Sequence, residues 1–137
     1  MDRDSQKFLY DLLETPSVSG FEQPVQRIVK RRMSQFAHEV RADVHGNLFV
    51  ALNPRGTVRV MLAGHCDQIG FMITHIDDNG FLYCKAIGGI DGSVLPGSRV
   101  TIMTRAGKIP GVIGHKPIHL VPQDERGKKL DLSKLWI

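Results

Sequence analysis

The first third of the chain shows hydrophobic positions at helical spacing. Residues 4–14 predict a helix, because one apolar stripe is formed by side chains three or four positions apart. The stripe consists of Phe8, Leu9, Leu12 and Leu13. Pro16 is expected to end this helix, since the residue before a proline avoids the helical region.

A second helix is predicted after Gly20. Ser19 and Glu22 match the S-x-x-E pattern of a capping box, and Pro24 fits the first helical turn. The buried face is expected to hold the apolar residues that follow at helical intervals, which are Val25, Ile28, Val29 and Phe36.

Shorter apolar runs begin at residue 39. Residues 39–42 predict an edge strand, 43–46 a turn, and 47–52 a second short strand. Residues 58–63 are almost continuously apolar and predict a buried strand. Two helices followed by short apolar strands are typical of a layered α/β domain.

Beyond Gly70 the pattern is that of β-hairpins. Residues 71–76 and 81–87 predict two strands around an Asn79-Gly80 turn, and 99–104 and 108–113 predict a second pair. Most of the 14 glycines lie in this half, as the tight corners of a small barrel require. We therefore expect a domain boundary near Gly70.

Composition and charge narrow the classes of partner. No apolar run approaches the roughly 20 residues of a membrane helix, and residues 1–4 lack a signal peptide's apolar core, so we expect a cytoplasmic protein without a membrane partner. The net charge is +4, with basic residues at Arg27, Lys30 and Arg31. No aromatic residues interleave with them, so a solvated helix face is favoured over nucleic-acid binding.

A polar H-x-D follows the predicted buried strand. In open α/β sheets, ligands bind outside the carboxyl ends of the strands. The imidazole of His65 could hold a metal ion that Asp67 shares or helps to orient. The alternative is a His and an Asp that cap a turn. Cys66 could act as a thiol ligand or nucleophile, although a small buried side chain is favoured.

Residues 63–70 (Ala-Gly-His-Cys-Asp-Gln-Ile-Gly) resemble a box found in metallopeptidase family forty-two. This family comprises the glutamyl, deblocking and tetrahedral (TET) aminopeptidases, some of them labelled cellulase M or endoglucanase. The resemblance extends in order through residues 15–22, Asp43 with 46–48, 88–89, 95–97 and 111–120. One departure lies inside the box, where Gln68 replaces the usual acidic residue.

The resemblance implies a fold class and an assembly. It implies an α/β, zinc-peptidase-like catalytic domain whose N-terminal part is residues 1–69. It also implies an inserted, β-rich, barrel-like domain over 70–137 that is incomplete and serves subunit contacts. Relatives form dimers that build into tetrahedral twelve-subunit shells, so a homo-oligomer is expected. The chain is expected to be the N-terminal portion of such an enzyme.

The same resemblance implies chemistry on peptide substrates. Family members remove N-terminal residues with two divalent metal ions, zinc or cobalt. By resemblance, His65 is a metal ligand and Asp67 is the carboxylate that orients its imidazole. The remaining ligands and the general base are expected in sequence that this chain lacks, so the chain alone is expected to be inactive.

Other residues leave alternatives open. His115 and His119 are four apart, but Pro117 between them favours a loop over a ligand pair on a helix. Asp77 and Asp78 are interpreted as a turn rather than a calcium loop or the acid pair of a glycoside hydrolase. Two rival functions are kept beside the aminopeptidase. One is a stand-alone assembly or binding module on the same scaffold, and the other is a glycoside hydrolase, since some relatives are labelled endoglucanase.

Overall fold

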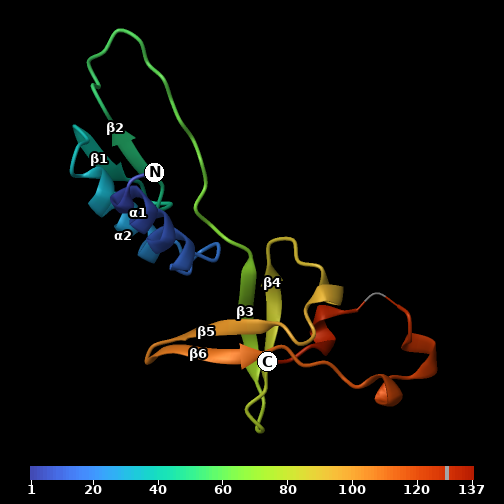
Figure 1. Ribbon diagram of the computed structural model, residues 1–137. Helices are drawn as coiled ribbons and strands as arrows, with labels where there is room; N and C mark the ends of the chain where they lie inside the picture. The colour runs from blue at the N-terminus through green and yellow to red at the C-terminus, as the bar shows by residue number, and fades with distance from the viewer. Residues whose placement is uncertain (129) are drawn as a thin grey trace. The chain divides into compact units, whose positions relative to one another are not determined.

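The chain folds into two compact units, Met1–Gln68 and Ile69–Ile137, in a computed structural model that describes residues 1–128 and 130–137. The first unit contains α1 (Arg3–Glu14), α2 (Gln23–Met33), β1 (Glu39–Ala42) and β2 (Leu48–Ala51) (Figure 1). The second contains β3 (Gly70–Ile76), β4 (Leu82–Ile87), β5 (Arg99–Thr104) and β6 (Gly107–Val112). It also holds the short 3-10 helices η1 (Gly92–Val94), η2 (Ile118–Leu120), η3 (Gln123–Glu125) and η4 (Leu132–Lys134). Among the described residues, no helix has the length and apolar character needed to cross a bilayer.

Helix α1 begins one residue earlier than predicted because Asp2 caps it. The Asp2 carboxylate accepts hydrogen bonds from the backbone nitrogen of Ser5 at 2.8 Å and from its hydroxyl at 3.1 Å. The helix ends at Glu14, two residues before Pro16, as the proline requires. The predicted first helix is confirmed.

Helix α2 is confirmed, but the predicted capping box is wrong. The helix begins at Gln23, and its N-cap residue Glu22 makes no side-chain capping bond. Instead, the Glu22 carboxylate accepts the backbone N–H of Gly20 at 2.7 Å, and the Ser19 hydroxyl donates to Asp67. Val25 is buried as expected, whereas Phe36 lies beyond the helix end and is 50% exposed.

Strands β1 and β2 lie where two short strands are predicted, and they pair as a hairpin. They pair antiparallel from Glu39 opposite Ala51 to Ala42 opposite Leu48. The turn between them is held by Asp43, whose carboxylate accepts the backbone N–H groups of His45 and Asn47. Local turn chemistry is sufficient to specify this hairpin.

The predicted buried strand over residues 58–63 is wrong. Figure 1 shows these residues as a bare connection, drawn in green between β2 and β3, and they form no strand. The side chains of Val58, Val60, Met61 and Leu62 are all exposed. A strand buried on both faces needs paired neighbours and covering layers. Within the described part of the first unit, β1 pairs only with β2, so no neighbour is offered.

Both hairpins predicted for the second unit are confirmed. Strand β3 pairs antiparallel with β4, with an irregularity between Ile73 and His75, and β5 pairs antiparallel with β6. The Asp77 carboxylate accepts backbone N–H groups of Asn79 and Phe81, so it closes the β3–β4 turn. The described strands form three two-stranded sheets, and closure into a barrel stays a prediction.

The last residues of the chain pack inside the second unit. Trp136 and Gly114 exchange two backbone hydrogen bonds, and Ile137 exchanges two with Leu82. Leu135 belongs to the buried cluster of this unit, whose other members are Leu95 and Ile113. A Cβ at Gly114 would lie 2.5 Å from the indole nitrogen, so glycine permits this contact. The apolar residues 135–137 therefore have neighbours within this unit.

Candidate functional site

The H-x-D segment is held in place by the stretch that follows α1. Val18 and Gln68 form a parallel β-bridge. The backbone nitrogen of Gln68 donates to the carbonyl of Ser17 at 2.8 Å, and that of Ser19 donates to the carbonyl of Gln68 at 3.3 Å. Two segments about fifty positions apart in sequence are thus joined immediately beside His65.

Three side chains form a chain of hydrogen bonds at this point. The Nδ1 atom of His65 lies 2.8 Å from Oδ1 of Asp67. The hydroxyl of Ser19 donates to Oδ2 of the same carboxylate at 2.6 Å. Asp67 is therefore held on both oxygens, and it in turn fixes the orientation of the imidazole.

The hydrogen bonds among Ser19, Asp67 and His65 determine which nitrogen of the imidazole is available to a metal ion. The Ser19 hydrogen bond, with a further contribution from the His65 hydrogen bond, lowers the pKa of Asp67 below its ordinary value. An ionised carboxylate only accepts hydrogen bonds, so Nδ1 carries the proton and the Nε2 lone pair is available. The His65 side chain is 85% exposed, and an imidazole in this state is suited to bind a metal ion.

Ser17 and Ser19 are the site residues that sequence reasoning missed. Ser17 is 1% exposed, and its hydroxyl donates to the carbonyl of Cys66 at 2.7 Å. The sequence predicts Ser19 as a helix cap, whereas in the structure its hydroxyl donates to the Asp67 carboxylate. The available signal was the alternation of two serines in an extended segment, since alternate residues of such a segment face the same side.

Cys66 is poorly suited to nucleophilic or thiolate chemistry. Its pKa is raised, first by burial of the thiol and then by the negative charges of Glu22 and Asp67. The thiol therefore stays protonated near neutral pH, and the reactive form of cysteine is the thiolate. The favoured interpretation is a small buried side chain, and the structure supports it only in part because Cys66 is partly buried.

The other candidate residues belong to the second unit. His115 is half-buried and lines a cavity of about 670 Å³ with Lys116 and Trp136, whereas His119 is exposed in η2. Asp77 serves the β3–β4 turn, which favours the turn interpretation. Over residues 1–128 and 130–137, no three His, Cys, Asp or Glu side chains are grouped so as to hold a metal ion.

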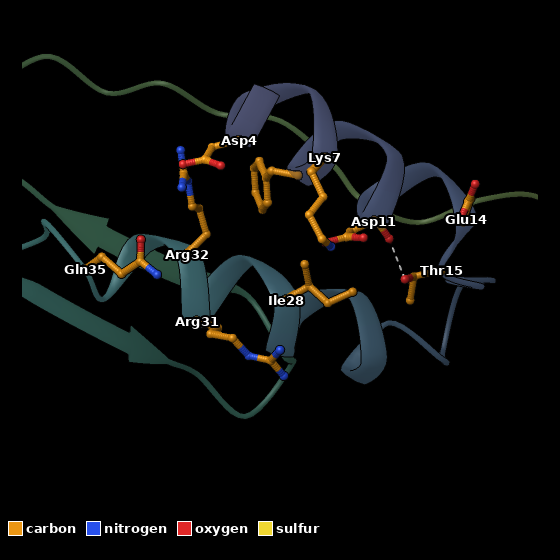
Figure 2. A pocket seen from close by; sticks show the side chains of 10 residues that line it. Asp4, Lys7, Asp11, Glu14, Thr15, Ile28, Arg31, Arg32 and Gln35 are labelled. Atoms are coloured by element: carbon orange, nitrogen blue, oxygen red, sulfur yellow. Dashed lines mark hydrogen bonds and ion pairs between the residues drawn. The ribbon is translucent and has the colours of Figure 1, made fainter. Parts of the chain in front are cut away.

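In the first unit, a groove lies between α1 and α2. Figure 2 shows charged side chains of both signs along this groove of about 610 Å³. Lys7 and Asp11 form an ion pair at 2.6 Å, and the Arg32 guanidinium lies 5.8 Å from the ring centre of Phe8. The ion pair lies within α1, whereas the contact between Arg32 and Phe8 joins α2 to α1.

Comparison with known proteins identifies the family. The profile described as M42 glutamyl aminopeptidase matches residues 46–137. The chain belongs to this family. The lysyl aminopeptidase of Pyrococcus furiosus is 34% identical over 128 residues, which are 92% of this chain and 37% of that protein. The sequence resemblance is therefore confirmed.

Solved structures agree over nearly the whole chain. The TET aminopeptidase of a marine-sediment Thaumarchaeota archaeon superposes with a TM-score of 0.87 at 35% identity, covering 97% of this chain and 38% of that one. The TET1 peptidase of Pyrococcus horikoshii, described as able to assemble into a tetrahedron or a large octahedral shell, gives 0.79 at 33% identity, covering 96% and 39%. The predicted mixed α/β class is confirmed, and the chain spans well under half the length of these relatives.

The Ser19 contact predicts a measurable change in the acid behaviour of the site. In Ser19→Ala we expect the pKa of Asp67 to rise toward its ordinary value, because the hydrogen bond that lowers it most is lost. A depressed carboxyl pKa contributes stability above the unfolded-state pKa, and this stability is lost as the pH falls through the folded-state pKa. In the variant the folded-state pKa of Asp67 lies closer to its unfolded-state value. The carboxylate should therefore contribute less stability, and this smaller contribution should be lost at a higher pH than in the unmodified chain.

Carboxyl-carbon NMR titration of Asp67 measures this shift directly. Ser5→Ala is the matched control, because Ser5 donates to Asp2 and not to Asp67. An unchanged Asp67 titration in Ser19→Ala would show that the serine does not hold the carboxylate.

Proposed function

We propose that this chain is the N-terminal portion of a metal-dependent aminopeptidase, which releases N-terminal residues from peptides. The observation that carries the proposal is the placement of His65. Its Nδ1 is hydrogen-bonded to Asp67, which Ser19 holds in turn, and its side chain is exposed with Nε2 open to solvent. Membership of the M42 family supports the reaction class. The whole enzyme would use two ions of zinc or cobalt, with His65 as one ligand.

The residues present fit part of such a centre. A neutral imidazole backed by a carboxylate is a common donor for zinc, and the carboxylate raises the basicity of the ring. When bound, the metal pair activates water and stabilises the developing oxyanion. In this chain, His65 would bind the metal ion. Asp67 orients the imidazole ring and keeps the proton on Nδ1, and Ser19 holds the Asp67 carboxylate in place. The general base and other ligands would come from the part of the relatives that this chain does not match.

Zinc binding by the isolated chain tests the role of His65. A single imidazole donates one bond, so we expect weak binding with fewer than two ions per chain. Titration followed by the ring-proton NMR signals should show that zinc perturbs His65, and that His65→Ala abolishes this binding. His45→Ala is the matched control, since this histidine is exposed in the β1–β2 turn of the same unit.

Two results would contradict the assignment. One is two tightly held ions per chain after gel filtration. The other is zinc affinity that does not change in His65→Ala. Either would place the metal on residues other than those proposed.

The proposed domain roles follow from the family. Residues 1–69 would form the start of the catalytic domain, and 70–137 would form part of an inserted barrel-like domain that contacts other subunits. The shells formed by the TET1 peptidase support a homo-oligomer for the whole protein. A cytoplasmic location is part of the same proposal, and so is the absence of membrane and nucleic-acid partners.

Self-association of the isolated chain tests the assembly role. Among the described strands β3 pairs only with β4, so its other edge is open, and open edges recruit strands. We expect sedimentation at high concentration to show dimers or larger species, but no complete shell. Met72→Lys, on this exposed strand, should weaken the association, whereas Val44→Lys in the β1–β2 turn should not. A clean monomer at high concentration would refute the role.

Two rival functions differ from this proposal in testable ways. A stand-alone assembly module would self-associate without His65-dependent zinc binding. A glycoside hydrolase would need two facing carboxylates, and Asp77 is already occupied in closing a turn.

A further inference from the structure

A buried hydroxyl holds the backbone of the H-x-D segment. Among the residues whose side chains the structure describes, Ser17 is the buried polar one, with 1% of its surface exposed. Its hydroxyl donates to the carbonyl of Cys66 at 2.7 Å, across 49 positions of sequence. Cys66 lies between His65 and Asp67, so this bond fixes the backbone from which both site side chains project. A buried hydroxyl is costly unless it is hydrogen-bonded, so the bond is expected to persist in solution.

Main-chain bonds hold the segment on the other side of Asp67. The backbone nitrogen of Gln68 donates to the carbonyl of Ser17, and the carbonyl of Gln68 accepts from the backbone nitrogen of Ser19. The backbone is therefore held at Cys66 by a side chain and at Gln68 by two main-chain bonds. With both of its neighbours fixed, Asp67 has little freedom to change the direction of its carboxylate.

A turn that depends on glycine sets the position of Ser19. The backbone nitrogen of Phe21 donates to the carbonyl of Val18 at 2.7 Å, which closes a four-residue turn. Of its two central residues, only Gly20 has a positive φ, at 88°. This pattern is that of a type II turn, whose third position is taken by glycine or, less often, asparagine. Gly20 therefore permits the turn in which Ser19 occupies the second position.

The turn and the Ser19 hydroxyl act on the same imidazole. Ser19 donates to the Asp67 carboxylate, which in turn holds Nδ1 of His65. The backbone nitrogen of Gly20 donates to the Glu22 carboxylate at 2.7 Å. A residue that prefers negative φ would favour a type I turn, in which the peptide between the two central residues is rotated. That rotation would break the bond to Glu22 and displace the neighbouring Ser19.

We propose that Ser17 and Gly20 are positioning residues that keep the His65 imidazole in the orientation required for metal binding. The inference rests on the proposed function, because this orientation matters only if His65 is a ligand. Groups that support a ligand set its direction and its protonated nitrogen, and a loosely supported ligand binds less well. Ser17 acts through the backbone of Cys66, and Gly20 acts through the position of Ser19.

The tautomer of His65 tests the positioning without any metal. At about pH 8.5 an ordinary imidazole is neutral, and long-range proton–nitrogen NMR correlations show which ring nitrogen carries the proton. In the unmodified chain we expect the proton on Nδ1. Ser17→Ala and Gly20→Ala should each give a mixture of the two tautomers, because Asp67 no longer holds the ring in one orientation. Gly20→Asn should restore the single tautomer, since asparagine tolerates this turn position.

Two matched variants separate positioning from a general loss of stability. Thr15→Val removes another hydroxyl that donates to a backbone carbonyl in the same unit, that of Asp11. Gly46→Ala introduces a side chain at a φ of 87° in the β1–β2 turn, and at Gly46, as at Gly20, no atom lies within 4 Å of the new Cβ. Both controls should lower the melting temperature about as much as the test variants and leave the His65 tautomer unchanged.

Zinc titration connects the positioning to the proposed site. In the unmodified chain and in Gly20→Asn, zinc should perturb the nitrogen signal of Nε2 most strongly, because Nδ1 carries the proton. In Ser17→Ala and Gly20→Ala, both ring nitrogens should respond, since either can present a lone pair. The nitrogen that responds is a property of the ring orientation, and a change in overall stability would not alter it.

Several results would overturn the proposal. A single Nδ1 tautomer in both Ser17→Ala and Gly20→Ala would show that neither residue positions the ring. A mixture in the unmodified chain, in Gly20→Asn or in either control would also contradict it. If Ser17→Ala does not fold, the Gly20 variants decide. Tautomers that change as expected while zinc leaves His65 unperturbed would refute the proposed function alone, and zinc binding at an unaltered tautomer in both variants would refute the positioning alone.

Discussion

Replacing His65 with alanine in a full-length protein that carries this segment is expected to remove one metal ion and nearly all aminopeptidase activity. His65 is held by Asp67 with Nε2 exposed, so the imidazole is the group through which this chain would contribute to a metal pair. Loss of the ligand removes the site at which water is activated and the oxyanion is stabilised. The measurements are metal content per chain and kcat/KM on a fluorogenic aminoacyl substrate.

Asp67→Asn should have a smaller effect that separates orientation from ligation. The asparagine oxygen can still accept from Nδ1, but it lacks the negative charge that raises the basicity of the ring. Metal affinity is expected to fall by about 10- to 100-fold, the usual cost of changing a group that supports a ligand. The fold should remain, because Asp67 lies near the surface.

His45→Ala is the matched control for both variants. This histidine lies in the β1–β2 turn of the same unit and should change neither metal content nor kcat/KM. Full activity in His65→Ala, or unchanged metal affinity in Asp67→Asn, would refute the assigned roles.

The hairpins were predictable from the sequence because their information is local. Asn79-Gly80 specifies a tight turn, and the Asp77 carboxylate that closes it lies within four residues of its partners. Asp43 holds the β1–β2 turn in the same way. Short-range hydrogen bonds of this kind depend on nothing elsewhere in the chain.

The error over residues 58–63 arose because burial is not a local property. An apolar run predicts that a strand will be covered, but the strands and helices that cover it must also be present. In the first unit β1 and β2 pair with each other, so the run remains exposed. The apolar pattern is typical of an interior strand, but the described residues offer no neighbour for it, and the predicted strand is therefore wrong.

The site was predicted only in part for a related reason. His65 and Asp67 are two residues apart, and the motif pointed to both. Ser19 is 48 residues from Asp67, and its own neighbourhood suggested a helix cap. As a helix cap, the Ser19 oxygen would accept a backbone N–H, whereas in the folded structure the Ser19 hydroxyl donates to the Asp67 carboxylate.

The 137-residue chain alone is expected to show no peptidase activity above a buffer blank. Metal-activated water and a positioned general base together lower the barrier to peptide hydrolysis. The described part of the chain has no cluster of three metal-binding side chains, and His65 and Asp67 provide one ligand and its support. The test is a fluorogenic aminoacyl substrate with added zinc or cobalt, and the intact Pyrococcus furiosus lysyl aminopeptidase serves as the positive control. Turnover that a chelator stops and His65→Ala abolishes would overturn this expectation, because it would require His115, His119 or Cys66 to complete a site.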